Sequence, residues 1–221
     1  IEPNAAHTVD FRRLLQAATE SHPPEVESEI QSVFRSSPRD LIRLATQNVD
    51  ALLGAALVLD DRVKRLDAES EAPGPLLSRL ERNRRRDGAH QLQKSLVTWA
   101  AYGAAGDLQV IRQFFLLLDA LPEDRDHLRA VMVGRFKTLA TSPETFAEVL
   151  PPLYGALVGA STLVRGAAAK VVGELPRRLL SDAPSLLLEA LVALLNDPYQ
   201  LVLSNTVKAL ERLTLPEPYH A

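Results

Sequence analysis

The sequence predicts an all-α chain of antiparallel helix pairs stacked into an α-solenoid. The main observation is an apolar pattern near the C-terminal end that repeats after 38 residues. The shift carries Leu150 to Leu188, Leu153 to Leu191, Leu157 to Leu195, Val164 to Val202 and Leu175 to Leu213. An apolar helix, a tight break and a second apolar helix at this period are typical of solenoids. Aromatic residues make up only 5% of the chain, and the abundant alanine, leucine and arginine favour helices over sheets.

A shorter shift of 36 residues extends the pattern toward the N-terminus. It carries Phe114, Leu117 and Leu121 to Leu150, Leu153 and Leu157, and it also carries Arg129 to Arg165. We therefore expect three consecutive units after about residue 105. Each helix pair alone would leave an apolar face uncovered, so stacking of the units makes the core.

These units resemble the HEAT repeat, an armadillo-like family. Members often have proline inside the first helix, here Pro151 and Pro152, and Val-Arg before small residues in the second, here Val164-Arg165 before Ala167 to Ala169. They also tend to carry a turn acid, which Asp197 supplies. Gly159 and Leu203 depart from the pattern at the turn acid and the second-helix arginine. The resemblance covers about the last third of the chain and implies a right-handed superhelical stack.

The predicted domains follow from breaker residues. Residues 1–66 form an N-terminal helical part of degenerate repeats, with one helix running from about Leu41 to Leu66. The acidic, proline- and glycine-containing segment 67–75 is a linker or loop. Residues 76–221 hold the HEAT-like units, at about 76–104, 107–140, 145–179 and 184–214. In the first of these we expect a short helix that Gly88 caps in the left-handed conformation, followed by a second helix.

Composition excludes several classes of protein. The chain has 221 residues, a net charge of −3 and no cysteine, so it has no thiolate metal site and no thiol nucleophile. The five histidines, at 7, 22, 90, 127 and 220, never stand three or four apart as ligand pairs do. No phosphate-binding glycine loop or nucleophile elbow occurs. We expect no catalysis, cofactor, metal or membrane span, a fragment of a larger protein, and a cytoplasmic or other reducing intracellular location.

One basic cluster has either a binding role or a structural role. Between Leu76 and Trp99, six cationic and two acidic side chains give a local charge of +4; the cations are Arg79, Arg82, Arg84, Arg85, Arg86 and Lys94. Such a cluster can hold a phosphate backbone or an acidic protein. Alternatively, it is a solvated helix end, or it pairs with the acidic residues of segment 67–75.

The sequence supports two hypotheses about function. The first is a non-catalytic scaffold that binds another protein, or another domain of the same chain, on a concave face formed by the second helices. Its candidate contacts are Lys170, Glu174, Lys208 and Arg212. The alternative is a HEAT-like solenoid that binds nucleic acid through Arg79–Arg86. The overall negative charge and the few aromatic residues favour the scaffold.

The repeat alignment also predicts specific contacts. The turn-acid positions are Glu123, Gly159 and Asp197, so Arg165 has no acid in its own unit and should reach Asp197 in the next. Val164, Ala168, Val172 and Leu175 should be buried between the last two units, where Ala167 to Ala169 permit close helix approach.

Overall fold

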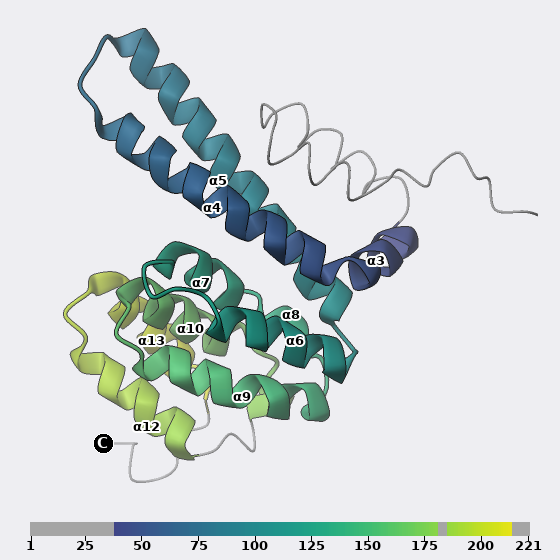
Figure 1. The fold of residues 1–221 in the computed structure, drawn as a ribbon. Coiled ribbons are helices and arrows are strands. Elements are labelled where there is room, and N and C mark those ends of the chain that lie inside the picture. Colours follow the sequence, from purple (N-terminus) through teal and green to yellow (C-terminus); the bar gives the residue numbers. More distant parts are fainter. Residues whose placement is uncertain (1–37, 181–184, 214–221) are drawn as a thin grey trace, which may run out of the picture. The chain divides into compact units, whose positions relative to one another are not determined.

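The computed structural model describes residues 38–180 and 185–213, and these are helical with no β-strand among them (Figure 1). The expected all-α class is confirmed. The helices predicted before Pro38 and the proline-rich end after Leu213 lie outside the described residues. The chain divides into two compact units, residues 1–103 (unit 1) and 104–221 (unit 2).

Unit 1 is built on two long antiparallel helices, α4 (Val49–Glu71) and α5 (Leu76–Ala104), preceded by α3 (Pro38–Gln47). The single helix predicted over 41–66 is divided at Asn48. The Asn48 side chain donates to the Leu44 carbonyl at 2.7 Å, a local bond that competes with continued helix. At the far end of α5, α3 crosses so closely that a Cβ on Gly103 would lie 2.4 Å from the Ala45 backbone.

The linker predicted over residues 67–75 is shorter in the structure. Helix α4 continues through the acidic residues to Glu71, and the chain turns only over residues 72–75, where the two prolines and Gly74 stand. Acidic side chains are compatible with a helix, whereas proline and glycine end one. The segment joins two helices of unit 1, and the division between units falls after Gly103.

The predicted helix end at Gly88 is wrong, because α5 runs through it without interruption. Glycine in a helix costs about 1 kcal/mol relative to alanine. The residues beyond it bury a continuous stripe that includes Leu92, Leu96 and Val97, each 0% exposed. Each such side chain contributes about 1.5–3 kcal/mol on burial, so packing outweighs the local preference. Residues 76–104 are therefore one helix of a hairpin and not a helix pair.

Unit 2 is a two-layer stack of helix pairs (Figure 1). One layer contains α6 (Leu108–Asp119), α9 (Pro143–Val158) and α12 (Ser185–Ala193), which is followed by the 3-10 turn η2 (Leu194–Asn196). The other contains α7 (Asp126–Val133) with α8 (Phe136–Leu139), then α10 (Thr162–Glu174) and α13 (Gln200–Leu210). A short helix, α11 (Arg177–Leu180), follows α10. We call the members of the second layer the second helices.

The ends of the first-layer helices follow from their sequences. Asp107 caps α6 by accepting from the amides of Gln109 and Val110. Ser142 and Thr145 form a capping box at the start of α9, with Pro143 in the first turn. Pro151 and Pro152 lie inside α9, as expected from the pattern of the first helices.

Two seams join the three pairs. The first seam lies between α6–α8 and α9–α10, and the second between α9–α10 and α12–α13. Val164, Ala168, Val172 and Leu175 are buried, but the prediction that they lie between the last two pairs is wrong. The close approach to α13, however, occurs at Gly166 and Gly173, where added Cβ atoms would lie 3.6 Å from Val202 and 3.5 Å from Ala209. At 100° per residue, Ala168 lies on the far side of α10 from Gly166.

Candidate interaction site

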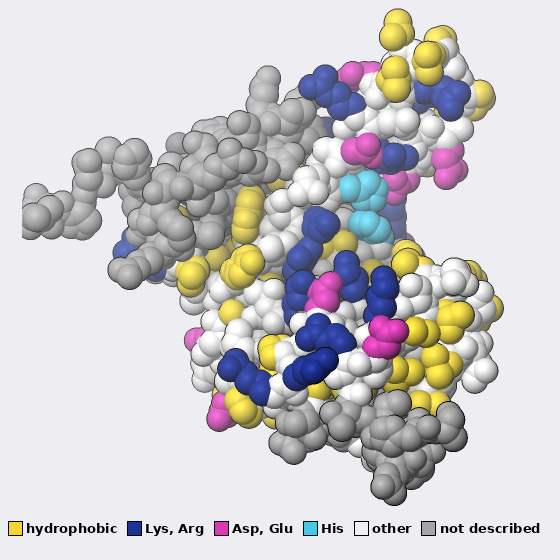
Figure 2. All heavy atoms as spheres, turned by 180° about the vertical axis from the view of Figure 1, so that it is seen from behind, with side chains coloured by type: hydrophobic (Ala, Val, Ile, Leu, Met, Phe, Trp, Pro, Cys, Tyr) yellow, Lys and Arg dark blue, Asp and Glu magenta, His cyan; other side chains and the backbone are white. Residues whose placement is uncertain are grey.

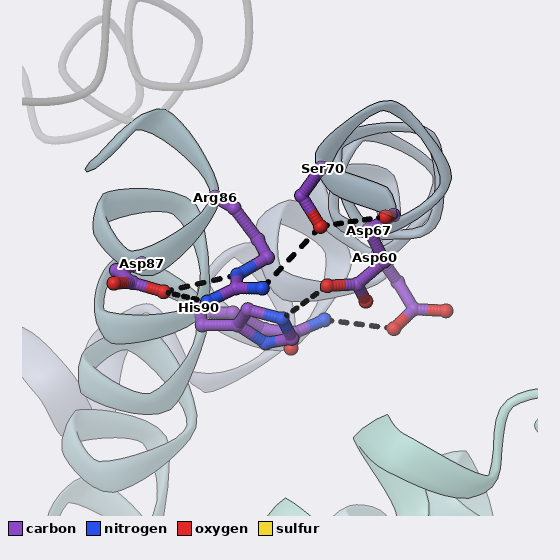
Figure 3. Close-up of polar contacts among 7 residues, drawn as sticks. Asp60, Asp67, Ser70, Arg86, Asp87 and His90 are labelled. Carbon is purple, nitrogen blue, oxygen red and sulfur yellow. Dashed lines mark hydrogen bonds and ion pairs between the residues drawn. The ribbon is translucent and has the colours of Figure 1, made fainter. Parts of the chain in front are cut away.

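Half of the predicted arginine cluster forms contacts within the α4–α5 hairpin, and Figure 3 shows those of Arg86 with Ser70 and Asp87. Arg82 donates to the Ala72 carbonyl at 2.8 Å, at the turn that joins the two helices. Arg86 donates to the Ser70 hydroxyl at 3.3 Å and to Asp87 at 2.8 Å. Arg85 pairs with Glu81 one helical turn away, at 3.1 Å. The hairpin itself thus satisfies three of the six cations.

The cluster therefore forms no single exposed surface. Arg79, Arg84 and Lys94 are exposed along α5. Arg82 and Arg86 contact segment 67–75 at Ala72 and Ser70, whereas its acidic residue Asp67 is bonded to His90 at 3.0 Å. These contacts position the hairpin, which is a structural role.

A buried polar pair lies deeper in the same hairpin and was not predicted. The Gln93 amide donates to Asp60 at 2.9 Å and to the Ala56 carbonyl at 3.3 Å. Both side chains are almost inaccessible, at 0% and 1% exposure. The sequence signal was available, since Asp60 and Gln93 fall on the apolar stripes of their helices, but nothing in the sequence pairs them.

The four predicted contact residues of unit 2 lie near one end of the second helices. Lys170 lies 3.9 Å from Glu174 at the end of α10. Arg212 donates to the carbonyls of Gly173 and Leu175, and so covers the C-terminal end of α10 from the next pair. Lys208 is exposed one turn earlier on α13, at the position that a shift of 38 gives for Lys170.

Further cations on this face were missed. Lys137, at the end of α8, forms an ion pair with Glu174. Arg178 donates to the Thr141 carbonyl at 3.4 Å, again across the first seam. The available signal was the repeat itself, because positions 137, 174 and 212 are separated by 37 and 38 residues. Figure 2 shows lysine and arginine side chains gathered on this face of unit 2, with acidic side chains among them.

We call this set of side chains the basic ridge: Lys137, Lys170, Arg178, Lys208 and Arg212, with Glu174 among them. Five cations and one carboxylate give it a charge of +4. The neighbouring exposed Arg177 and Glu211 cancel each other. Cations near the C-terminal ends of helices interact favourably with the exposed carbonyls, which explains in part why they collect there.

At the opposite end of the second helices, Arg165 links the last two pairs. Its Nε donates to Asp197 at 2.8 Å, and its Nη1 donates to the Gly159 and Ala160 carbonyls at 3.0 and 2.5 Å. The predicted reach across the repeat boundary is confirmed. The hydrogen bond from Arg165, with the backbone amide of Tyr199, holds the pKa of Asp197 below its ordinary value despite burial.

Other candidate chemistry finds no support in the described residues. Among residues 38–180 and 185–213, no group of three or more potential ligand side chains could hold a metal ion. Trp99 is half-buried, and Tyr102 beside it is exposed. In the same ranges, no helix has the length and apolar character needed to cross a membrane.

Comparison of the chain with protein-family models, with curated proteins and with solved structures finds no match.

Proposed function

We propose that this chain is a non-catalytic scaffold segment, a HEAT-like solenoid whose second helices bind an acidic segment of another protein or of another domain of the same chain. The observation that carries the proposal is the basic ridge. Its cations come from three consecutive helix pairs, and two of them, Lys170 and Lys208, are separated by the 38-residue repeat. Such a row suits an extended partner, which would contact successive units.

A protein partner fits the ridge better than nucleic acid does. Glu174 lies between Lys137 and Lys170 and pairs with both, so two of the five cations are already partly neutralised. Arg212 is also engaged, by the carbonyls at the end of α10. Nucleic-acid affinity depends on many free phosphate contacts, and the chain as a whole carries −3. A partner with a few carboxylates needs fewer free cations.

The test uses a fluorescein-labelled peptide of alternating Glu and Leu and measures its binding by anisotropy. We expect binding to the parent chain and a rise in Kd of about tenfold in Lys170→Ala/Lys208→Ala, because two exposed cations are lost. Arg79→Ala/Arg84→Ala is the matched control, with the same charge change in unit 1, and should leave Kd unchanged. Equal binding by the parent and the Lys170/Lys208 variant contradicts the assignment of the ridge.

Binding of a short DNA duplex tests the alternative function. Binding through Arg79–Arg86 would give an affinity that falls steeply with salt, with a log-log slope of about −0.9 per phosphate contacted. Duplex binding that survives ~0.15 M salt and is lost in Arg84→Ala/Arg85→Ala/Arg86→Ala would replace the scaffold by a nucleic-acid-binding solenoid. We expect negligible duplex binding at that salt concentration.

A further inference from the structure

Unit 2 contains a groove of about 870 Å³ at the turn ends of its first two helix pairs. It lies along the first seam, between the end of α6 with the start of α7 and the end of α9 with the start of α10. Its apolar lining includes Phe115, Leu118, Val133, Pro152 and Val164. This volume is within the range of pockets that bind small ligands or a few side chains of a partner.

The groove exists because one wall has almost no side chains. Gly155, Ala156, Gly159, Ala160 and Ser161 line it from the end of α9 and the following turn. A Cβ on Gly155 would meet nothing within 4 Å, so the space beside this helix is open. At the second seam, the position equivalent to Gly159 is Asp197, which pairs with Arg165 across the seam.

Arg129 is the counterpart of Arg165 one unit earlier, and it also lines the groove. Its guanidinium donates to the carbonyls of Leu121 and Pro122, as Arg165 does to those of its own turn, but the next unit offers no acid at position 159. The Ser161 hydroxyl, another lining group, is buried and has no hydrogen-bond partner among the described residues. A buried hydroxyl without a partner costs free energy, so a bound polar group could be accommodated there.

The charge of the lining selects the ligand. Asp119, Glu123 and Asp126 line the groove with Arg129 as the single cation, which gives a charge of −2. The Arg129 charge faces two carbonyl oxygens, so the three carboxylates dominate the rim. A cation is attracted to such a rim, and a carboxylate is repelled even though Arg129 is near.

We propose that this groove docks a short segment of a partner protein in which a large apolar side chain stands next to lysine or arginine. The apolar side chain occupies the space beside Gly155, against Phe115, Leu118 and Val164. The cation lies at the rim with Asp119, Glu123 and Asp126. This site is separate from the basic ridge and opposite to it in charge, so the two proposals can fail independently.

The test measures anisotropy of three labelled decapeptides, of alternating Leu and Arg, Ser and Arg, and Leu and Glu. Gly155→Leu fills the groove, and Gly54→Leu is its control, because Gly54 is also helical with open space around it but lies in unit 1. We expect the Leu–Arg peptide to bind the parent and Gly54→Leu equally. Gly155→Leu should raise its Kd about tenfold or more, because the apolar anchor loses its place.

A charge variant tests the rim. Asp119→Asn/Glu123→Gln should weaken binding of the Leu–Arg peptide severalfold, while Glu189→Gln/Glu211→Gln, with the same change in net charge elsewhere in unit 2, should not. Thermal melts verify that each variant is folded; leucine in place of a helical glycine should keep or raise Tm.

Four results would overturn the proposal. The first is equal affinity of the Ser–Arg and Leu–Arg peptides, which would mean attraction by charge alone. The second is unchanged binding of the Leu–Arg peptide to a folded Gly155→Leu variant, and the third is no binding of that peptide to the parent. Preference for the Leu–Glu peptide that persists in Lys170→Ala/Lys208→Ala and is lost in Gly155→Leu would reverse the assigned charge and also reject it.

Discussion

The two seams of unit 2 share the pair α9–α10, yet only the second is closed at its turn end. There Asp197 accepts from Arg165, and its side chain is only 4% exposed. At the first seam Gly159 stands where the acid would be, Arg129 turns to nearby carbonyls, and a groove of about 870 Å³ remains. A missing turn acid thus separates a seam that only holds pairs together from one with room for a ligand.

The helices also pack more closely at the second seam than at the first. At the second seam α10 presents Gly166 and Gly173 to α13, and the Asn205 amide donates to the Gly166 carbonyl at 3.0 Å. A Cβ added at either glycine would already be in van der Waals contact with α13. At the first seam the small residues at the end of α9 face the groove. Small residues therefore close one seam and open the other, depending on what lies opposite.

The largest expected effect comes from placing leucine at a glycine of each seam. Gly173→Leu should destabilise the chain by up to about 3 kcal/mol, because its Cβ would already be in contact with the Ala209 backbone at 3.5 Å and the rest of the side chain would push against α13. Gly155→Leu should be neutral or stabilising by up to about 1 kcal/mol, since helix propensity improves and the space is open. Urea unfolding monitored by circular dichroism measures both. Equal destabilisation by the two substitutions would contradict the contrast.

The second prediction concerns the ion pair that closes the second seam. Arg165→Ala should cost about 2–3 kcal/mol, because it leaves the nearly buried Asp197 carboxylate without its cation and two carbonyls without a donor. Arg129→Ala is the matched change at the first seam and should cost less, about 1 kcal/mol, because no carboxylate is left behind. The free energy of unfolding in urea is again the measurement. A larger loss for Arg129→Ala would mean that the groove seam carries the stability.

Sequence reasoning succeeded where the repeat carries the contact. The shifts of 36 and 38 residues align Arg129, Arg165 and the turn acids, so the Arg165–Asp197 pair could be predicted without knowing any distance. The same alignment identified Gly159 as the departure. That the departure leaves a groove could not be predicted, because this depends on how α6 and α7 pack against α9.

Sequence reasoning failed where packing opposes local preference. Gly88 is a common helix terminator, but the buried stripe of α5 carries the helix through it. Asp60 and Gln93 pair inside the hairpin although each is an unusual core residue alone. Arg82 and Arg86 bond the end of α4 for a related reason: the α4–α5 turn brings residues 70 and 72 beside the start of α5, which only the pairing of the two helices reveals.

The third prediction uses the lowered pKa of Asp197. A carboxyl whose pKa is lower in the folded than in the unfolded chain stabilises the fold above the unfolded value, about 3.9 for Asp. That stability is lost as pH falls through the folded pKa. The difference in unfolding free energy between the parent and Asp197→Asn should therefore be constant near neutral pH and shrink below about pH 4. Denaturation curves at several pH values test this. A difference that persists unchanged into strong acid would mean that Asp197 acts by shape and not by charge.

The smallest effect belongs to an ion pair on the outside of the first seam. Arg112 on α6 donates to Glu148 on α9 through Nε at 3.0 Å and Nη2 at 2.5 Å, 36 residues apart. This hydrogen bond lowers the pKa of Glu148 and raises that of Arg112. The geometry is bidentate, as in a strong pair, but Arg112 is 59% exposed, whereas Arg165 is only 15% exposed. Water and salt therefore screen the Arg112 pair far more.

We accordingly expect Arg112→Ala to destabilise the chain much less than Arg165→Ala does, and about 0.5 M salt to remove most of that small effect. Arg165→Ala, measured in the same urea titrations at both salt concentrations, should keep most of its effect, because its carboxylate partner is nearly inaccessible to ions. The contrast would collapse if both substitutions lost their effect in salt to the same degree. Burial of the Asp197 carboxylate would then not explain why the second seam is more stable than the first.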